Sequence, residues 1–285
     1  MESTAVIART AEASAGDDGH AQGSAPGERT PHSSVRSGIA AGLSSLGLLW
    51  WWVLRTPFVG LADNGDWGRY SCPNGLYGRV QFAQLPATLT RQACPAFDYR
   101  STFTGFLGVF AKVDIATSGA VHLSHLAVFW SLVVSIGWGW LTFELARATG
   151  RPGRSLAMSV AMIVVSSDII FTSYFGSVYA EGMVIALTPA LAAALVRVVR
   201  SERLDRPTIV VTGMLLVAIT AAKPSLALTA PLFLAVVLLA RRDRLELVPV
   251  ATAVIGALAL SVFSFTAIAD PTFTEWNTYN LAFTV

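Results

Sequence analysis

Asp63, Asp66 and Arg69 stand at successive three-residue steps in the run LADNGDWGRY, residues 61–70. If this stretch is helical, the three side chains share one face. A carboxylate on that face could position and deprotonate a hydroxyl, and the guanidinium could hold an anion. The alternative is an Asn-Gly turn in which the aspartates bond to their own backbone. The run alone leaves both interpretations open.

Three later positions also carry side chains suited to chemistry. Asp168 lies in VVSSDII near the end of an apolar stretch, where an ionised group is costly and marks a candidate functional site. The run SYFGSVYAE, residues 173–181, is an aromatic-rich turn that ends in the carboxylate of Glu181. Lys223 follows in AAKPS and could bind a phosphate. The alternatives are an ordinary interfacial aspartate, a plain turn with interfacial tyrosines, and a lysine facing lipid headgroups.

Other motifs carry less information. His122 and His125 are three residues apart, but no third ligand stands nearby in the sequence, so we predict no metal site. Glu144 is expected to meet Arg147 or water. The sequence has no Walker loop, G-x-G-x-x-G, H-E-x-x-H or G-x-S-x-G motif. ATP-driven transport and soluble-type hydrolysis therefore lose support.

Long apolar blocks surround these residues. Of 285 residues, 53% are hydrophobic and 13% are charged, with mean hydropathy +0.56, whereas a soluble domain carries roughly 25% charged residues. This excludes an ordinary soluble enzyme. The net charge of +2 comes with arginines in short loops between blocks, which gives no indication of nucleic-acid binding. We predict an all-α integral membrane protein with seven candidate spans: 38–54, 119–143, 155–172, 182–196, 208–222, 225–240 and 247–268.

Not every block has the length of a full span. The fourth, fifth and sixth are shorter than the ~20 residues that a span needs, so one or two of them could cross only half the membrane. Residues 101–115 are apolar but interrupted by Lys112 and Asp114, which favours an interfacial or re-entrant helix. Residues 1–37 have no apolar run and are predicted to be a disordered tail preceding a transmembrane domain at 38–285. The first apolar block starts too late for a cleaved signal peptide and is expected to be an anchor.

Arginine distribution predicts the orientation, because cytoplasmic loops carry the excess of Lys and Arg. If all seven blocks cross, the basic segments fall on one side. The tail is then cytoplasmic, and residues 55–118 form a large extracytoplasmic loop. The arginines that support this are Arg9, Arg29, Arg36, Arg147, Arg151, Arg154, Arg197, Arg200, Arg203, Arg206, Arg241, Arg242 and Arg244.

The two cysteines agree with this orientation. Cys72 and Cys94 both fall in the predicted outer loop, where an oxidising compartment allows a disulfide. A large loop without its own core benefits from such a bond, so we predict that they pair; two free thiols are the alternative. The run Trp50–Trp52 at the outer end of the first block is typical of interfacial anchoring.

Three runs together resemble a known family. DNGDWGR at 63–69, YFGSVYAE at 174–181 and AKP at 222–224 resemble bacterial glycan-biosynthesis hexose transferases, within the GT-C class of multi-span membrane glycosyltransferases. The resemblance implies a hexose donor linked to polyprenyl phosphate as co-substrate and a cell-envelope glycan as acceptor, with no further cofactor specified. It also implies that Asp66, or alternatively Asp63, is the general base, in a first extracytoplasmic loop that carries interfacial helices.

The remaining site residues follow from the chemistry of such a transfer. Attack at the anomeric carbon needs a base near the acceptor oxygen and cations around the departing lipid phosphate. Arg69, Arg79 and Lys223 could supply the cations. Asp168 and Glu181 are further polar candidates. The aromatic residues suited to sugar faces, or equally to a membrane interface, are Trp67, Tyr70, Tyr174 and Tyr179.

Two other classes of function compete with this one. A lipid-linked-sugar flippase or other transporter would place polar groups at mid-membrane, whereas the acidic residues here cluster toward one face. A non-catalytic membrane subunit or a degenerate remnant of an enzyme is the third possibility. Members of the GT-C class generally have more spans, and this chain ends soon after its seventh block, so we expect a partial member.

Overall fold

The computed structural model describes residues 31–55, 67–77, 88–91, 99–201, 205–241 and 247–267. The chain divides into two units, Met1–Thr30 and Pro31–Val285, and all described residues belong to the second. Helix α1 begins at Pro31, so the residues just before 38, predicted to be tail, form its first turns. Ser34 and Ser37 of these turns are buried.

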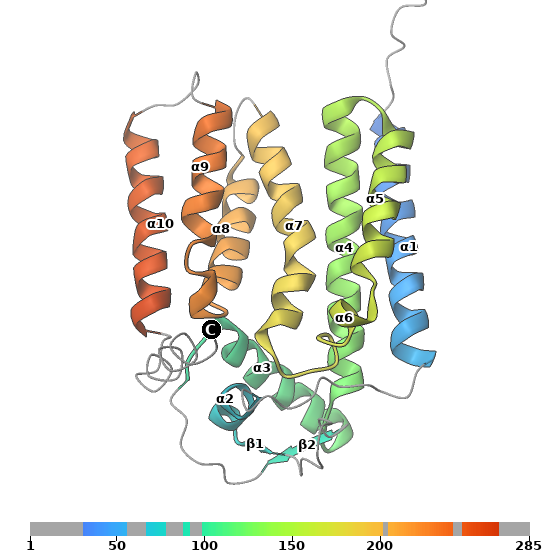
Figure 1. Ribbon diagram of the computed structural model, residues 1–285, viewed down its shortest axis with the longest axis vertical. Coiled ribbons are helices and arrows are strands. Elements are labelled where there is room, and N and C mark those ends of the chain that lie inside the picture. Colours follow the sequence, from blue (N-terminus) through green and yellow to red (C-terminus); the bar gives the residue numbers. More distant parts are fainter. Residues whose placement is uncertain are drawn as a thin grey trace, which may run out of the picture. The chain divides into compact units, whose positions relative to one another are not determined.

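Long helices run side by side in this second unit (Figure 1). Every predicted apolar block contains a helix, although the third is broken between α5 and the short α6. The helices are α1 (Pro31–Arg55), α4 (Leu123–Thr149), α5 (Pro152–Ser166), α6 (Ile169–Thr172), α7 (Ala180–Arg200), α8 (Arg206–Thr220), α9 (Thr229–Arg241) and α10 (Leu247–Ala267). A short 3-10 helix, η2 (Pro224–Leu226), connects α8 to α9.

Membrane-spanning capacity is shown for fewer helices than the sequence predicts. Within the described residues, two helices, α4 and α7, are long and apolar enough to cross a membrane. The apolar stretches described in α5, α8, α9 and α10 are shorter than 18 residues. The prediction of seven spans is therefore not confirmed. The structure is mostly helical, as predicted.

Helix α7 is the central helix of the bundle, with α4 on one side and α8 on the other. Large exposed apolar side chains lie on the other long helices, but none lies on α7. Apolar surface of this extent is costly in water and normal in lipid. Close packing of α4 on α7 depends on Gly137, where a Cβ would lie 3.0 Å from the backbone nitrogen of Ala190.

A small outer segment, comprising the described residues between α1 and α4, lies at one end of the bundle (Figure 1). Its strands form an antiparallel sheet in the order β1-β2-β3. Leu76 pairs with Arg91, and Leu89 pairs with Val121. The elements are α2 (Trp67–Ser71), η1 (Cys72–Asn74), β1 (Leu76–Tyr77), β2 (Thr88–Arg91), α3 (Thr102–Ser118) and β3 (Val121–His122).

Helix α3 corresponds to the apolar stretch predicted at 101–115. It starts at a capping box, in which the Ser101 hydroxyl accepts from the Thr104 nitrogen and the Thr104 hydroxyl accepts from the Ser101 nitrogen. It ends at Gly119, whose φ of 81° favours glycine. The Thr102 hydroxyl donates to the Ala218 carbonyl at 2.7 Å. This bond fixes the start of α3 to the end of α8.

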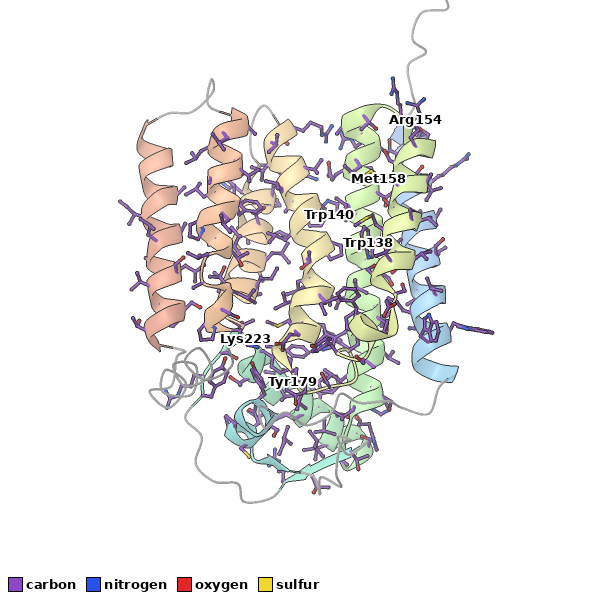
Figure 2. The ribbon with its side chains drawn as sticks, viewed as in Figure 1. Trp138, Trp140, Arg154, Met158, Tyr179 and Lys223 are labelled. Carbon is purple, nitrogen blue, oxygen red and sulfur yellow. The ribbon has the colours of Figure 1, made fainter. Side chains whose placement is uncertain are left out.

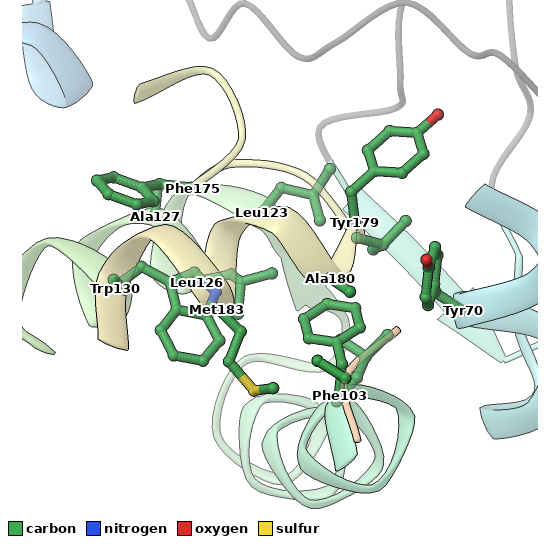
Figure 3. Close-up of a cluster of buried hydrophobic side chains, with 14 of the residues drawn as sticks. Tyr70, Phe103, Leu123, Leu126, Ala127, Trp130, Phe175, Tyr179, Ala180 and Met183 are labelled. Atoms are coloured by element: carbon green, nitrogen blue, oxygen red, sulfur yellow. The ribbon is translucent and has the colours of Figure 1, made fainter. Parts of the chain in front are cut away.

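The buried core lies where the outer segment meets α4 and the start of α7 (Figure 3). Phe103 of α3, Leu126 of α4 and Val178 before α7 are fully buried there. Trp130 and Met183 extend the same cluster into the bundle. Because residues from all three regions share one core, the outer segment has a fixed position on the helices that carry the site residues.

Candidate functional site

Glu181 and Lys223 form an ion pair at the end of the bundle next to the outer segment. The Lys223 Nζ atom donates to Glu181 Oε1 at 2.6 Å. Glu181 lies in the first turn of α7, where the helix dipole stabilises a carboxylate. Lys223 is the residue before η2, at the α8–α9 connection. The fold thus brings together two predicted site residues that are 42 positions apart.

Both members of the Glu181–Lys223 pair can form further hydrogen bonds. The Glu181 Oε2 atom is buried and accepts no hydrogen bond within the described structure. The lysine ammonium has three donors, and Glu181 takes one of them. The Lys223 and Glu181 side chains are 24% and 33% exposed, so a ligand can approach the pair. The pair can therefore hold an anion through the lysine and a donor group through the carboxylate.

Tyr70 and Tyr179 lie in the core beside this region (Figure 3). Both are less than 5% exposed, and their ring centroids are 6.2 Å apart. Tyr70 also packs edge-on against Tyr99 at 5.3 Å and Phe103 at 5.5 Å. These contacts give the two tyrosines a packing role, which fixes α2 against α7. Their contact with a sugar remains a prediction.

Asp168 is exposed and lies at the break between α5 and α6. Its carbonyl accepts hydrogen bonds from the Phe171 and Thr172 nitrogens, both at 3.0 Å. The side chain of Ser167 bonds the Ile163 carbonyl at 2.6 Å, which accompanies the end of α5. Within the described residues, Asp168 makes no bond to Glu181 or Lys223.

The predicted base lies outside the described residues. Asp63, Asp66 and Arg79 are not among them, and for Trp67 and Arg69 the structure describes only their place in α2. The described helix is Trp67–Ser71, and the shared helix face of Asp63, Asp66 and Arg69 stays a prediction.

Of the two cysteines in the predicted disulfide, only Cys72 lies among the described residues. Cys72 is not a free cysteine, and Cys94 lies outside the described residues. Pairing between the two therefore remains a prediction.

A carboxylate–imidazole pair that the sequence did not predict lies at the end of α3. Asp114 Oδ1 is 2.7 Å from His125 Nδ1, and Asp114 Oδ2 accepts from the His122 nitrogen at 2.6 Å. Burial raises the pKa of Asp114, but bonds from His125, His122 and Ser118 outweigh burial and hold the pKa below its usual value. The sequence contains a signal for the burial of Asp114, because this residue continues the helical spacing of Phe103, Leu107 and Ala111, which are buried on α3. A carboxylate on a buried stripe requires a partner.

This pair gives His125 a partner other than a metal ion. The His122 and His125 rings lie 4.9 Å apart. Among the residues that the structure describes, no group of three or more His, Cys, Asp or Glu is arranged to hold a metal.

Glu144 differs from its prediction. It is fully buried and accepts from Arg200 at 3.0 Å, from Trp140 at 3.3 Å and from Arg197 at 3.4 Å. The expected contact with Arg147 is wrong, because Glu144 faces α7 while Arg147 is exposed. Arg197 also reaches Asp205 at 3.4 Å. These charges connect α4, α7 and the start of α8.

The two charged clusters mark opposite ends of α7. Glu181 is 16 residues from Arg197 and 19 from Arg200, which corresponds to about 24 and 29 Å along an α-helix. The hydrocarbon core of a bilayer is about 30 Å thick. The apolar part of α7 therefore has the length of a membrane span, with ion pairs at both limits.

Comparison with known proteins gives one match. Searches of curated proteins and of solved structures found no match. The model of the YfdI N-terminal transmembrane domain family matches residues 32–284. This range includes α1 to α10 almost completely. The chain is therefore a membrane protein that belongs to the YfdI N-terminal transmembrane domain family.

Proposed function

We propose that this protein is a membrane glycosyltransferase of the GT-C type. It moves a hexose from a polyprenyl-phosphate donor to a cell-envelope glycan on the outer face of the membrane. The observation that carries the proposal is the Glu181–Lys223 pair, with its 2.6 Å contact at one end of the central helix. That pair combines a cation for a lipid phosphate with a carboxylate, at the end of the bundle where the outer segment packs.

The proposed chemistry uses two kinds of group. Asp66, or alternatively Asp63, takes the proton of the acceptor hydroxyl while that oxygen attacks the anomeric carbon. The bond from the anomeric carbon to the phosphate oxygen breaks, and the polyprenyl phosphate leaves with the electron pair. Lys223, together with Arg69 and Arg79, compensates the negative charge that develops on the leaving group. Glu181 holds the Lys223 ammonium in place.

The proposed orientation puts the pair outside the cell. The described helix ends opposite the pair carry most of the arginines. We call this the Arg-rich end and define it by Arg36, Arg147, Arg151, Arg154, Arg197, Arg200 and Arg206. The positive-inside rule favours the cytoplasm for this end. The N-terminus is then cytoplasmic, and the outer segment is extracytoplasmic.

A transfer assay with lysine variants tests the proposal. The chain has two lysines, Lys112 and Lys223, which provides a matched control. Purified protein in lipid nanodiscs is given a labelled polyprenyl-phosphate hexose and a glycan acceptor. We expect Lys223→Met to lower kcat by about 10²- to 10³-fold and Lys223→Arg to retain more activity. Lys112→Met should behave as wild type, since Lys112 is exposed on α3.

The same assay addresses the base. Asp66→Asn or Asp63→Asn should lower the rate by about 10²- to 10⁴-fold without a change in melting temperature. Equal losses in Lys112→Met and Lys223→Met would contradict the role of Lys223. A wild-type protein that transfers no hexose, yet moves the lipid-linked sugar across vesicles, would replace the proposal with transport.

A further inference from the structure

An apolar groove runs between α1 and α4 on the surface of the bundle. Its volume is about 480 Å³. Ile39 and Leu43 of α1 form one wall, and Ile136 and Phe143 of α4 form the other. Ile136 is 72% exposed, and Leu43 is 64% exposed, so the groove opens to the surroundings of the bundle.

Glycines form the floor of this groove. A Cβ on Gly38 would lie 2.8 Å from the Gly139 carbonyl oxygen, and a Cβ on Gly139 would lie 3.0 Å from the Gly38 oxygen. The two backbones are therefore in contact, as in small-residue packing of membrane helices. Because the floor lacks side chains, the larger residues beside it leave a channel that they do not fill.

The groove has the depth of one membrane leaflet. It extends from Val35 to Leu46 on α1 and from Phe143 back to Leu132 on α4. Eleven residue-to-residue steps on each helix correspond to about 16.5 Å, and half of the hydrocarbon core is about 15 Å. A single lipid chain that enters at the Arg-rich end would reach the middle of the membrane where the groove ends.

Two arginines stand at the shallow end of the groove. Arg36 directly follows Val35 on α1, and the Arg147 guanidinium lies over the Phe143 ring at 5.4 Å. Both are exposed, and neither makes an ion pair with a described carboxylate. Figure 2 shows Arg154 at this same end of the bundle and the groove residue Trp140 deeper along α4. The cations therefore lie at the mouth of an otherwise apolar channel.

We propose that this groove binds one anionic glycerophospholipid from the leaflet at the Arg-rich end. One acyl chain lies on the glycine floor, and the phosphate lies between Arg36 and Arg147. The charge at the mouth favours an anionic headgroup over a zwitterionic one by about fivefold per arginine. This site goes beyond the proposed function, because it lies at the opposite end of the bundle from the Glu181–Lys223 pair.

Native mass spectrometry of the full chain tests the proposal. Protein is released from nanodiscs of equimolar phosphatidylglycerol and phosphatidylethanolamine, and the lipids that stay bound are counted. We expect wild type to retain phosphatidylglycerol preferentially. The double variant Arg36→Gln/Arg147→Gln should reduce this preference about 25-fold. Arg206→Gln is the matched control, because Arg206 is an exposed arginine at the start of α8, and the groove is lined by residues of α1 and α4 alone.

A second pair of variants tests the groove itself. Ile136→Trp fills the channel and should displace the lipid, whereas Met214→Trp adds the same bulk to an exposed site on α8. Equal retention of both lipids by wild type would overturn the proposal. An equal loss in Arg206→Gln and the double variant would also overturn it, as would a crosslink from Ile136→Cys to a second copy of the chain.

Discussion

Asp114 is a buried carboxylate whose two oxygens are both bonded, one to His125 and one to the backbone of His122. These bonds favour the charged form more than burial opposes it, so the pKa of Asp114 lies below its usual value. A depressed carboxylate pKa stabilises the fold above the unfolded pKa of about 3.9, and this contribution is lost as pH falls through the lower folded pKa.

We therefore predict an acid-dependent stability that Asp114 controls. The melting temperature of wild type in detergent should fall as pH is lowered below about 4. Asp114→Asn should melt lower than wild type at pH 7, and its melting temperature should change less in the acid range. Asp168→Asn is the control, because Asp168 is exposed. Identical acid profiles for wild type and Asp114→Asn would contradict the prediction.

Site residues differed in how far the sequence could reveal them. Glu181 and Lys223 were candidates because they are isolated charges next to apolar blocks, but their 2.6 Å contact depends on how α7 and α8 pack. In the sequence, Asp114 stands out only as an interruption of an apolar run. Its place among the buried residues of α3 predicts that the carboxylate is buried. Its partner could not be predicted, because His125 belongs to another helix.

At the scale of elements, α1 and α4 depend on glycine contact. Gly38→Ala would bring a methyl group 2.8 Å from the Gly139 oxygen, so the backbones must separate. We expect destabilisation of about 1–3 kcal/mol, seen as a lower melting temperature. Gly47 lies on the same helix with nothing within 4 Å of a Cβ. Gly47→Ala should be neutral or stabilising, and equal effects of the two changes would disprove close packing at Gly38.

Helices could be predicted from the sequence more fully than strands. Each apolar block contains a helix, because a long apolar segment in lipid satisfies its backbone hydrogen bonds within itself only as a helix. The strands β1 and β3 have two residues each, which is too short for an alternating pattern. Their pairing with β2 depends on tertiary contacts. The break near Asp168 cannot be predicted from the apolar pattern, because few polar residues interrupt the block there.

At the scale of the whole molecule, the arginine distribution predicts the topology. A fluorescent reporter fused after Arg151 should be active, because that turn is expected in the cytoplasm. Alkaline phosphatase fused after Asn74 should be active, because the outer segment is expected to be exported. The reverse pattern in both fusions would overturn the orientation and would place the Glu181–Lys223 pair inside the cell.

The membrane class could be predicted from composition alone, whereas the number of spans could not. Composition reports apolar content, but crossing a membrane needs continuous length, which α4 and α7 have among the described helices. The shorter helices depend on neighbours and on lipid adjustment at their ends. Those are properties of the assembled bundle, not of any one segment.

The charges at both limits of α7 also restrict how the protein can sit in bilayers of different thickness. Between Glu181 and Arg200 the helix measures about 29 Å along its axis. A shift along the membrane normal would carry one of these ion pairs into hydrocarbon. In thicker membranes the surrounding lipid must therefore thin locally, and in thinner ones α7 must tilt. Hydrophobic mismatch would then strain both ends of α7 at once, and the lipid environment could alter the Glu181–Lys223 pair without any ligand.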